Sequence, residues 1–318
     1  EPLNLNYTPE SHREGLATYF REFLRSHMKK WINDENNRKP DGSKYNLNTD
    51  GLKIYTTINY TMQQMAELAV EQHMPRLQKE FFEQNKTLDD SIAPFRELTS
   101  GAVDTLLRIS MRRSERWRKM KYDLKKDNEE IENSFFEPVD MTIFSWGGDI
   151  DTIMTPLDSM KYYKSFFRPG MMSMDPTNGH IKAWVGGMNY RHFQYDMVKK
   201  GKRQIGSTFK PFVYAAAIDQ LKLSPCDTFP DSQFCIEKNK FGNIEQWCPK
   251  NSGDKYGRTR TLKNALANSV NTVTARLMDR IGPQTVVKLA KDLGIEQRIL
   301  PVPSIALGTP DLSVYEMV

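Results

Sequence analysis

The sequence lacks the features that mark membrane-spanning, secretory-precursor and nucleic-acid-binding chains. None of its apolar runs approaches the roughly 18 residues of a membrane-spanning helix, and its mean hydropathy is −0.64. It starts at Glu1 without an initiator Met or a signal peptide, so we expect a cut point there and leave a lost anchor open. A net charge of +5 is too small to indicate nucleic-acid binding unless the charge is clustered.

Cysteine is scarce, and its three occurrences, Cys226, Cys235 and Cys248, fall in one loop-like region. Their spacing matches no zinc-binding pattern, and no histidine lies among them. Two interpretations stay open: a disulfide between two of them with the third free, or three unpaired thiols. The sequence predicts no metal site.

Charge is dense in residues 76–135, where a helical pattern carries a basic run between Arg108 and Lys126. Such a run could contact nucleic acid, another anionic polymer or a membrane surface. The acidic stretch at residues 127–132 follows directly and would weaken its attraction for phosphate. We therefore predict a solvated helix face and no nucleic-acid partner.

The length of 318 residues favours two domains, or one large domain with an insertion. Periodicity predicts a helix from Arg13 to Trp31, and residues 52–58 predict a strand. A helix is expected from Thr61 to a break near Pro75. The later pattern predicts a strand at 141–144, a turn at 147–149, a helical end before 167, a hairpin with a two-residue Asn178-Gly179 loop, a surface loop at 225–256, and helices at 262–267, 271–278 and 284–293.

The stretch from Arg203 to Phe212 leads into an alanine-rich apolar segment, which predicts a helix starting near Gly206. Ser207 and Lys210 are three residues apart and so share one helix face. A serine hydroxyl is a weak nucleophile that needs a base, and a lysine amine can serve when burial lowers its pKa. Gly206 would let the backbone approach closely. The competing interpretation makes Ser207 a helix N-cap.

The Ser-x-x-Lys spacing alone is weak, because it also occurs at Ser26–Lys29 and Ser252–Lys255. The first lies on a peripheral charged helix, and the second lies in a flexible loop that does not enforce the geometry. Only the serine at position 207 opens a segment that looks buried.

Support for Ser207 comes from Ser269 and Asn271, the only Ser-x-Asn in the chain. In a turn between helices both side chains can point into one cleft. The hydroxyl can relay a proton, and the amide can donate to a substrate carbonyl while accepting from a lysine ammonium. The alternative is a helix cap beside a buried polar pair.

Ser-x-x-Lys followed by Ser-x-Asn is the pairing of penicillin-binding proteins and class A β-lactamases. On these motifs the chain resembles the class A (bifunctional) penicillin-binding proteins, which are peptidoglycan synthases, and within them the 1A group. The blocks that carry the resemblance are residues 51–57, 174–187, 203–214 and 303–317. It covers roughly residues 10–75 and 140–318.

The resemblance implies a mixed α/β fold of the serine β-lactamase/transpeptidase type. An antiparallel sheet would be flanked by helices, with the nucleophile on a central helix and a mainly helical N-terminal region. The implied division is a lead-in at 1–50, a linker with a charged helical insertion at 51–168, and an incomplete transpeptidase domain at 169–318.

The resemblance also implies acyl transfer on peptidoglycan stem peptides that end in D-Ala-D-Ala. Ser207 would attack, Lys210 would act as base, Ser269 would pass a proton to the leaving amine, and Asn271 would orient Lys210 and the substrate amide. β-Lactams would acylate the same serine, and no cofactor or metal is needed. The parent protein would bind lipid-linked glycan strands and other cell-wall synthesis proteins, anchored in the bacterial inner membrane with its catalytic domain on the extracytoplasmic side.

Two departures from the family pattern qualify this interpretation. The glycosyltransferase domain, expected ahead of Glu1, is absent, and no Lys-Thr/Ser-Gly tripeptide occurs. We expect a truncation after Val318, and a fragment without that strand can be inactive. The alternatives are a D,D-carboxypeptidase or β-lactamase-like hydrolase, and a non-catalytic penicillin-binding scaffold or sensor domain.

Overall fold

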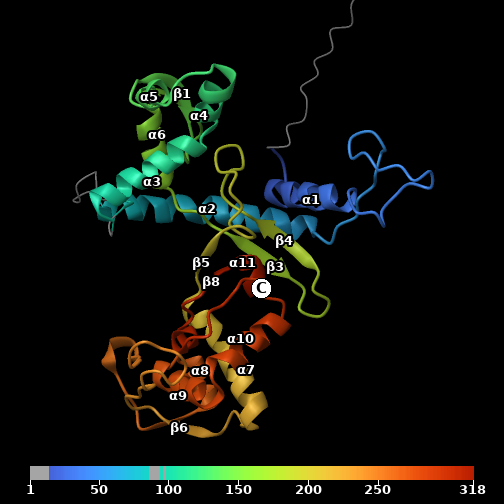
Figure 1. The fold of residues 1–318 in the computed structure, drawn as a ribbon. Helices are drawn as coiled ribbons and strands as arrows, with labels where there is room; N and C mark the ends of the chain where they lie inside the picture. Colours follow the sequence, from blue (N-terminus) through green and yellow to red (C-terminus); the bar gives the residue numbers. More distant parts are fainter. Residues whose placement is uncertain (1–13, 86–93, 96–97) are drawn as a thin grey trace, which may run out of the picture. The chain divides into compact units, whose positions relative to one another are not determined.

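The computed structural model describes residues 14–85, 94–95 and 98–318 (Figure 1). Compactness divides the chain into two units, Glu1–Tyr195 and Asp196–Val318. This division differs from the expected start of the transpeptidase domain at residue 169, which stays a prediction. In the part of the chain that is described, no helix combines the length and apolar character needed to cross a membrane.

The first unit is built on helices α1 (Thr18–Trp31) and α2 (Tyr60–Asn85) and on the hairpin of β3 (Met171–Met174) and β4 (Ile181–Val185). The first helix confirms the predicted one over these residues, whereas the expected start at Arg13 lies outside the described residues. The buried Gln63 of α2 ties the helix to the hairpin: its Nε2 donates to Trp184 O (2.9 Å) and its Oε1 accepts from Trp184 N (2.7 Å).

The predicted helix end near Pro75 is wrong, because α2 continues through this proline to Asn85. Beyond it, Gln78 is 1% exposed. Its side chain donates to Ser165 O (2.9 Å) and accepts from Phe167 N (3.0 Å). These contacts offset the backbone hydrogen bond that a proline inside a helix cannot make.

The predicted strand at residues 52–58 is also wrong, because this segment has no regular secondary structure and is mostly exposed. Near the end of this segment Thr57 Oγ1 donates to Ile181 O (2.8 Å) of the hairpin, and just beyond it Asn59 N donates to Lys182 O (2.9 Å). β-branched residues do not form a strand without a neighbouring edge to pair with.

The charged segment is mainly helical where it is described, as predicted; residues 86–93 and 96–97 of it lie outside the described part. It contains α3 (Ser100–Arg113), α4 (Glu115–Arg118), a π-helical turn (Lys119–Asp123) and α5 (Asn128–Asn133). Arg108 pairs with Glu132 and Lys126 with Glu130. The acidic stretch therefore neutralises part of the basic run, as the solvated-face interpretation requires.

Two antiparallel hairpins complete the first unit. One pairs β1 (Val139–Ile143) with β2 (Ile150–Met154) around the predicted turn, and helix α6 (Pro156–Lys164) follows. Strand β2 was not predicted. The β3–β4 hairpin is confirmed, but its loop is longer than the expected two residues, because Asp175 N donates to His180 O (2.9 Å) across residues 176–179.

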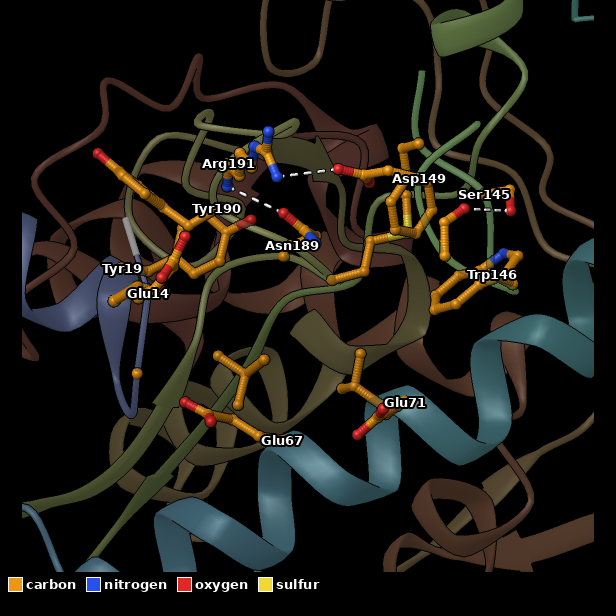
Figure 2. Close-up of a pocket in the computed structure, with 18 residues that line it drawn as sticks. Glu14, Tyr19, Glu67, Glu71, Ser145, Trp146, Asp149, Asn189, Tyr190 and Arg191 are labelled. Carbon is orange, nitrogen blue, oxygen red and sulfur yellow. Dashed lines mark hydrogen bonds and ion pairs between the residues drawn. The ribbon is translucent and has the colours of Figure 1, made fainter. Parts of the chain in front are cut away.

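A cavity of about 560 Å³ opens within the first unit (Figure 2). Its walls come from residues 14–19, α2, the β1–β2 turn and the segment after β4. The ring of Tyr19 lies over Gly187, where a Cβ atom would stand 2.3 Å from the tyrosine oxygen. Tyr19 Oη donates to Phe193 O (2.6 Å). Because Gly187 has no side chain, the ring of Tyr19 has room to make this hydrogen bond and to form part of the cavity wall.

The second unit packs helices α7 (Lys210–Leu221), α9 (Asn271–Ile281) and α10 (Pro283–Asp292) around one apolar core that includes Phe209, Val273 and Leu277. The predicted helices at 262–267, 271–278 and 284–293 correspond to α8 (Leu262–Ala267), α9 and α10. Two short antiparallel pairs border the core, namely β5 (Lys202–Gln204) with β8 (Asp311–Ser313), which precedes α11 (Val314–Met317), and β6 (Thr228–Pro230) with β7 (Thr259–Thr261).

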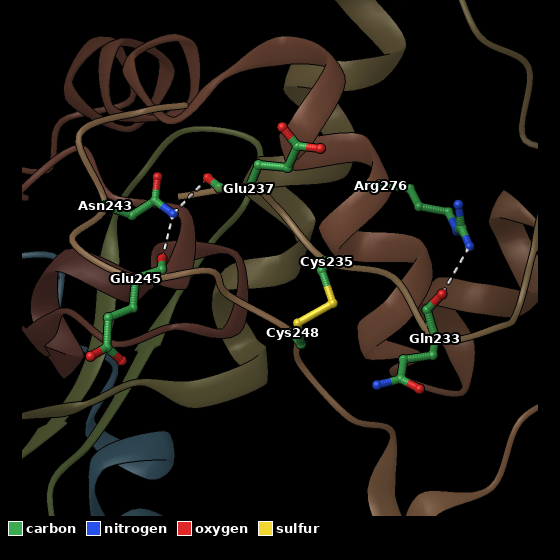
Figure 3. Close-up of a disulfide and its surroundings, with 7 residues drawn as sticks. All are labelled: Gln233, Cys235, Glu237, Asn243, Glu245, Cys248 and Arg276. Carbon is green, nitrogen blue, oxygen red and sulfur yellow. Dashed lines mark hydrogen bonds between the residues drawn. A yellow bond between two sulfur atoms is a disulfide. The ribbon is translucent and has the colours of Figure 1, made fainter. Parts of the chain in front are cut away.

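A disulfide joins Cys235 to Cys248 in the segment between β6 and β7 (Figure 3). Cys226 is free and exposed. Of the two interpretations left open by the sequence, the structure therefore supports one disulfide with a third, free cysteine. The same segment is less superficial than expected, because Ile236 and Asp231 have no exposed surface.

Candidate functional site

Two glycines bring the backbone close together just before Ser207. Gly206 N donates to Gly308 O (2.9 Å), and a Cβ atom on Gly308 would lie 1.7 Å from Gly206 O. Both residues have positive φ, 57° and 76°. The close approach expected at Gly206 is present, and Gly308 is the residue that makes it sterically possible.

Ser207 lies in a 3-10 turn, Gly206–Phe209, that leads directly into α7. Lys210 N donates to Ser207 O, so both residues stand on one edge of this turn, as residues three apart do in a 3-10 helix. The Ser207 side chain is exposed and makes no hydrogen bond within the described part of the chain. The N-cap interpretation fails, because the cap positions are Ile205 for the turn and Phe209 for α7.

Lys210 is 1% exposed, and its ammonium group is surrounded by oxygen acceptors. Its Nζ donates to Ser269 O (2.6 Å), Ser269 Oγ (2.9 Å) and Asn271 Oδ1 (2.6 Å). These three bonds match the three donors of an ammonium group. Burial lowers the pKa of Lys210 from 10.5 to about 8, because the charged form is the one that loses hydration.

Ser269 and Asn271 reach Lys210 from the turn between α8 and α9. Ser269 has a positive φ of 52°, which is uncommon for a residue with a side chain, and in this conformation both its carbonyl and hydroxyl oxygens accept from Lys210. Asn271 is the first residue of α9. The structure therefore brings Lys210, Ser269 and Asn271 into direct contact, with Ser207 one turn before the lysine.

The other two Ser-x-x-Lys pairs are not built into comparable sites. Ser26 and Lys29 are exposed on α1, and Ser252 and Lys255 are exposed in and after a short 3-10 turn, Ser252–Asp254.

Sequence reasoning missed a buried polar network next to the site. Asp231 has no exposed surface and accepts from Asn251, Thr272, Arg260 and the backbone of Gly257. No motif or spacing in the sequence points to this carboxylate, and its segment reads as surface loop. Its partners are up to 41 residues away along the chain, so only the fold reveals them.

Comparison with known proteins places these residues in a family. Residues 169–304 match the family model described as the penicillin-binding protein transpeptidase domain, and residues 90–167 match that of the penicillin-binding protein middle domain. Penicillin-binding protein 1A of Aquifex aeolicus is 28% identical over 281 residues, which are 84% of this chain and 36% of that protein. Penicillin-binding protein 1A of Neisseria lactamica is 34% identical over 140 residues, 44% of this chain and 17% of that protein.

The fold class is confirmed by a solved structure. The crystal structure of penicillin-binding protein 1A from Haemophilus influenzae superposes with a TM-score of 0.56 at 20% identity. The match covers 94% of this chain and 44% of that one. The chain therefore has the mixed α/β transpeptidase fold with a mainly helical N-terminal region, and it spans about a third of the Aquifex relative's length.

Proposed function

The chain belongs to the penicillin-binding proteins, and from this premise we propose that it is a serine D,D-transpeptidase that works through an acyl-enzyme on Ser207. Its substrates would be peptidoglycan stem peptides ending in D-Ala-D-Ala, and β-lactams would acylate the same serine. The observation that carries the proposal is the buried Lys210 ammonium, held by Ser269 and Asn271 one turn from an exposed serine.

In the first step the hydroxyl oxygen of Ser207 attacks the carbonyl carbon of the penultimate D-Ala. The proton of the hydroxyl passes to the neutral amine of Lys210, whose pKa of about 8 leaves roughly one lysine in ten neutral at pH 7. The backbone N–H of Ser207 would be one donor to the developing oxyanion, an interaction worth about 2.7–4 kcal/mol in such sites.

In the second step the bond to the terminal D-Ala breaks, and its amine needs a proton. Ser269 Oγ, which lies 2.9 Å from Lys210 Nζ, is suited to pass that proton from the lysine to the leaving amine. The amine of a second stem peptide then attacks the acyl-enzyme, its proton returns through the same groups, and Ser207 is regenerated. Asn271 holds Lys210 and would orient the substrate amide.

The proposal places the site outside the cytoplasm. The Cys235–Cys248 disulfide supports this, because structural disulfides persist in oxidising compartments. The full-length protein would carry a glycosyltransferase domain, act on lipid-linked glycan strands, hold to the inner membrane by an anchor and work with other cell-wall synthesis proteins. These assignments follow the family and the longer relatives.

A product assay with the full-length protein tests the proposal. A stem pentapeptide ending in D-Ala-D-Ala is incubated with and without an acceptor amine, and free D-Ala and cross-linked peptide are counted. We expect D-Ala release in proportion to cross-link, and loss of both in Ser207→Ala. Release of D-Ala without cross-linking would identify a carboxypeptidase, and no release would leave a penicillin-binding scaffold.

A further inference from the structure

Asp231 is a buried carboxylate whose four hydrogen bonds fix its orientation completely. Its Oδ1 accepts from Asn251 Nδ2 (2.7 Å) and Thr272 Oγ1 (2.8 Å), and its Oδ2 accepts from Arg260 Nε (2.6 Å) and Gly257 N (3.0 Å). Burial alone would raise the pKa of Asp231, but these hydrogen bonds outweigh burial and lower it. The group is therefore an ionised anchor and not a proton donor.

Asn251 connects this anchor to the start of α9. Its Nδ2 donates to Asp231 Oδ1 and to Lys255 O (3.0 Å). Its Oδ1 accepts from Asn271 N (3.0 Å) and Thr272 N (3.2 Å), two of the amides that a helix leaves unsatisfied in its first turn. The N-cap residue itself, Val270, has no side-chain acceptor, so Asn251 performs the capping from a distant loop.

The same loop decides which end of the Asn271 amide faces Lys210. Asn271 Nδ2 donates to Lys250 O (2.7 Å), and Asn271 Oδ1 accepts from Lys210 Nζ (2.6 Å). A backbone carbonyl can only accept, so the NH₂ end must face Lys250 and the oxygen must face the ammonium group. Lys250 precedes Asn251 in the sequence. By holding Asn251, Asp231 therefore fixes two hydrogen bonds of Asn271: the one from its backbone N to Asn251 Oδ1 and the one from its Nδ2 to Lys250 O.

We propose that Asn251, anchored by Asp231, is a positioning residue of the acyl-transfer site: it fixes the backbone and the amide orientation of Asn271 and thereby the acceptor of Lys210. The inference rests on the proposed function for its effect on acylation. Both residues act on the site indirectly, because they hold Asn271 and the first turn of α9 in place.

The first test replaces the connecting residue. In Asn251→Ala the first two amides of α9 lose their acceptor, the carbonyl of Lys250 is released, and Asn271 is free to rotate. We expect the rate constant for acylation by benzylpenicillin to fall about tenfold, the effect of one lost hydrogen bond to a charged group. Asn251 is only half-buried, so this variant should stay folded.

A swap of the two side chains distinguishes positioning from general stability. Asn251→Asp alone keeps an oxygen acceptor for the first amides of α9. It also places a second carboxylate next to that of Asp231, so the two repel each other and the acylation rate should fall. Combined with Asp231→Asn, the amide introduced at position 231 can donate to the carboxylate introduced at position 251 and to Thr272 Oγ1, while its oxygen still accepts from Arg260 and Gly257. The carboxylate at position 251 cannot donate to Lys255 O, so we expect the double variant to recover part of the lost rate.

The matched control is Asn243→Ala in the same loop. Asn243 Nδ2 donates to Glu237 O (2.9 Å) and Glu245 O (2.7 Å) beside the disulfide (Figure 3). Among the described residues, no hydrogen bond of its side chain reaches residues 249–251. This variant should acylate at the wild-type rate. Equal rates for Asn251→Ala and Asn243→Ala, or a swap variant no faster than Asn251→Asp, would overturn the inference.

A titration of Lys210 by NMR, with ¹³C-labelled lysine, separates this inference from the proposed function, because it needs no acylation. Losing the fixed Asn271 acceptor removes a bond to the charged form, so the pKa of Lys210 should fall further below its ordinary value in Asn251→Ala and return in the swap variant. An unchanged pKa in Asn251→Ala would refute the positioning role. Absence of acylation in the wild type would instead refute the proposed function.

Discussion

Lys210 carries two opposing requirements in one side chain. Burial disfavours its charged form and lowers its pKa to about 8, whereas three oxygen acceptors hold the ammonium in one place. A base for serine must be neutral when it accepts the proton and must lie in a fixed position. Lys210 combines a lowered pKa with a side chain that three acceptors hold in place.

The first prediction follows from this pKa. If neutral Lys210 takes the Ser207 proton, acylation by benzylpenicillin should become about tenfold faster per pH unit up to about pH 8 and level off above it. The groups that accept from Lys210, Ser269 and Asn271, do not titrate in this range, so one step is expected. A rate that is flat between pH 6 and 9 would assign the base to another group.

The second prediction concerns stability. The pKa of Lys210 is lowered on folding, so below pH 8 the group is charged in both states and its burial destabilises the folded state fully. Between about pH 8 and 10.5 the folded state loses its proton first, and stability should rise with pH. Over this pH range the free energy of unfolding of the wild type, measured with urea, should increase by about 3 kcal/mol more than that of Lys210→Met.

A control for this measurement is Lys263→Met, since Lys263 is exposed on α8. Its stability should follow the wild type across the same pH range. A difference curve for Lys210→Met that is flat, or that falls with pH, would contradict the lowered pKa.

At the scale of elements, local chemistry predicted the helices of the second unit well. Helix α8 has the expected bounds, and the break between α9 and α10 lies at Gly282 and Pro283, where the glycine has a positive φ of 75° and the proline opens the next helix. In these helices the local signals and the buried apolar face agree.

The secondary-structure predictions were wrong where contacts between residues far apart in the sequence determine the structure. Helix α2 passes through Pro75 because Gln78 is anchored by residues 165 and 167. Residues 52–58 have strand-like composition but pair with no strand among the described residues. Likewise the sequence could supply Ser207, Lys210, Ser269 and Asn271 as candidates, whereas Asp231 and Asn251 carry no local signal. Their roles depend on side chains that folding brings together.

The third prediction concerns the glycine contact before the serine. In Gly308→Ala the new methyl would clash with the backbone of Gly206 in addition to the strain of positive φ. We expect a loss of at least about 3 kcal/mol of stability and slower acylation, because Gly206 and with it Ser207 must move. Thermal unfolding and penicillin acylation measure the two effects.

Gly294→Ala provides the matched comparison. Gly294 also has a positive φ, of 100°, but a Cβ atom there would meet open space. The Gly294→Ala variant should lose only about 1 kcal/mol of stability and should be acylated at the wild-type rate. Equal losses in the two variants would mean that backbone strain, and not the close approach to Gly206, sets the cost.

At the scale of the whole molecule, the chain consists of two compact units, and the transpeptidase match at residues 169–304 begins in the first and continues into the second. The β3–β4 hairpin packs on α2 in the first unit, although it falls within the transpeptidase match. The family match starts at residue 169, whereas the two compact units divide between Tyr195 and Asp196, and the domain boundary at residue 169 stays a prediction.

We propose Ser207 as the nucleophile and Lys210 as its base. The most direct measurement is intact-mass analysis of the full-length protein after exposure to benzylpenicillin, followed by mapping of the modified peptide. We expect one penicilloyl adduct on the peptide that carries Ser207, none in Ser207→Ala, and strongly slowed adduct formation in a folded Lys210→Met. An equal adduct in Ser207→Ala, or one mapped to another residue, would contradict it.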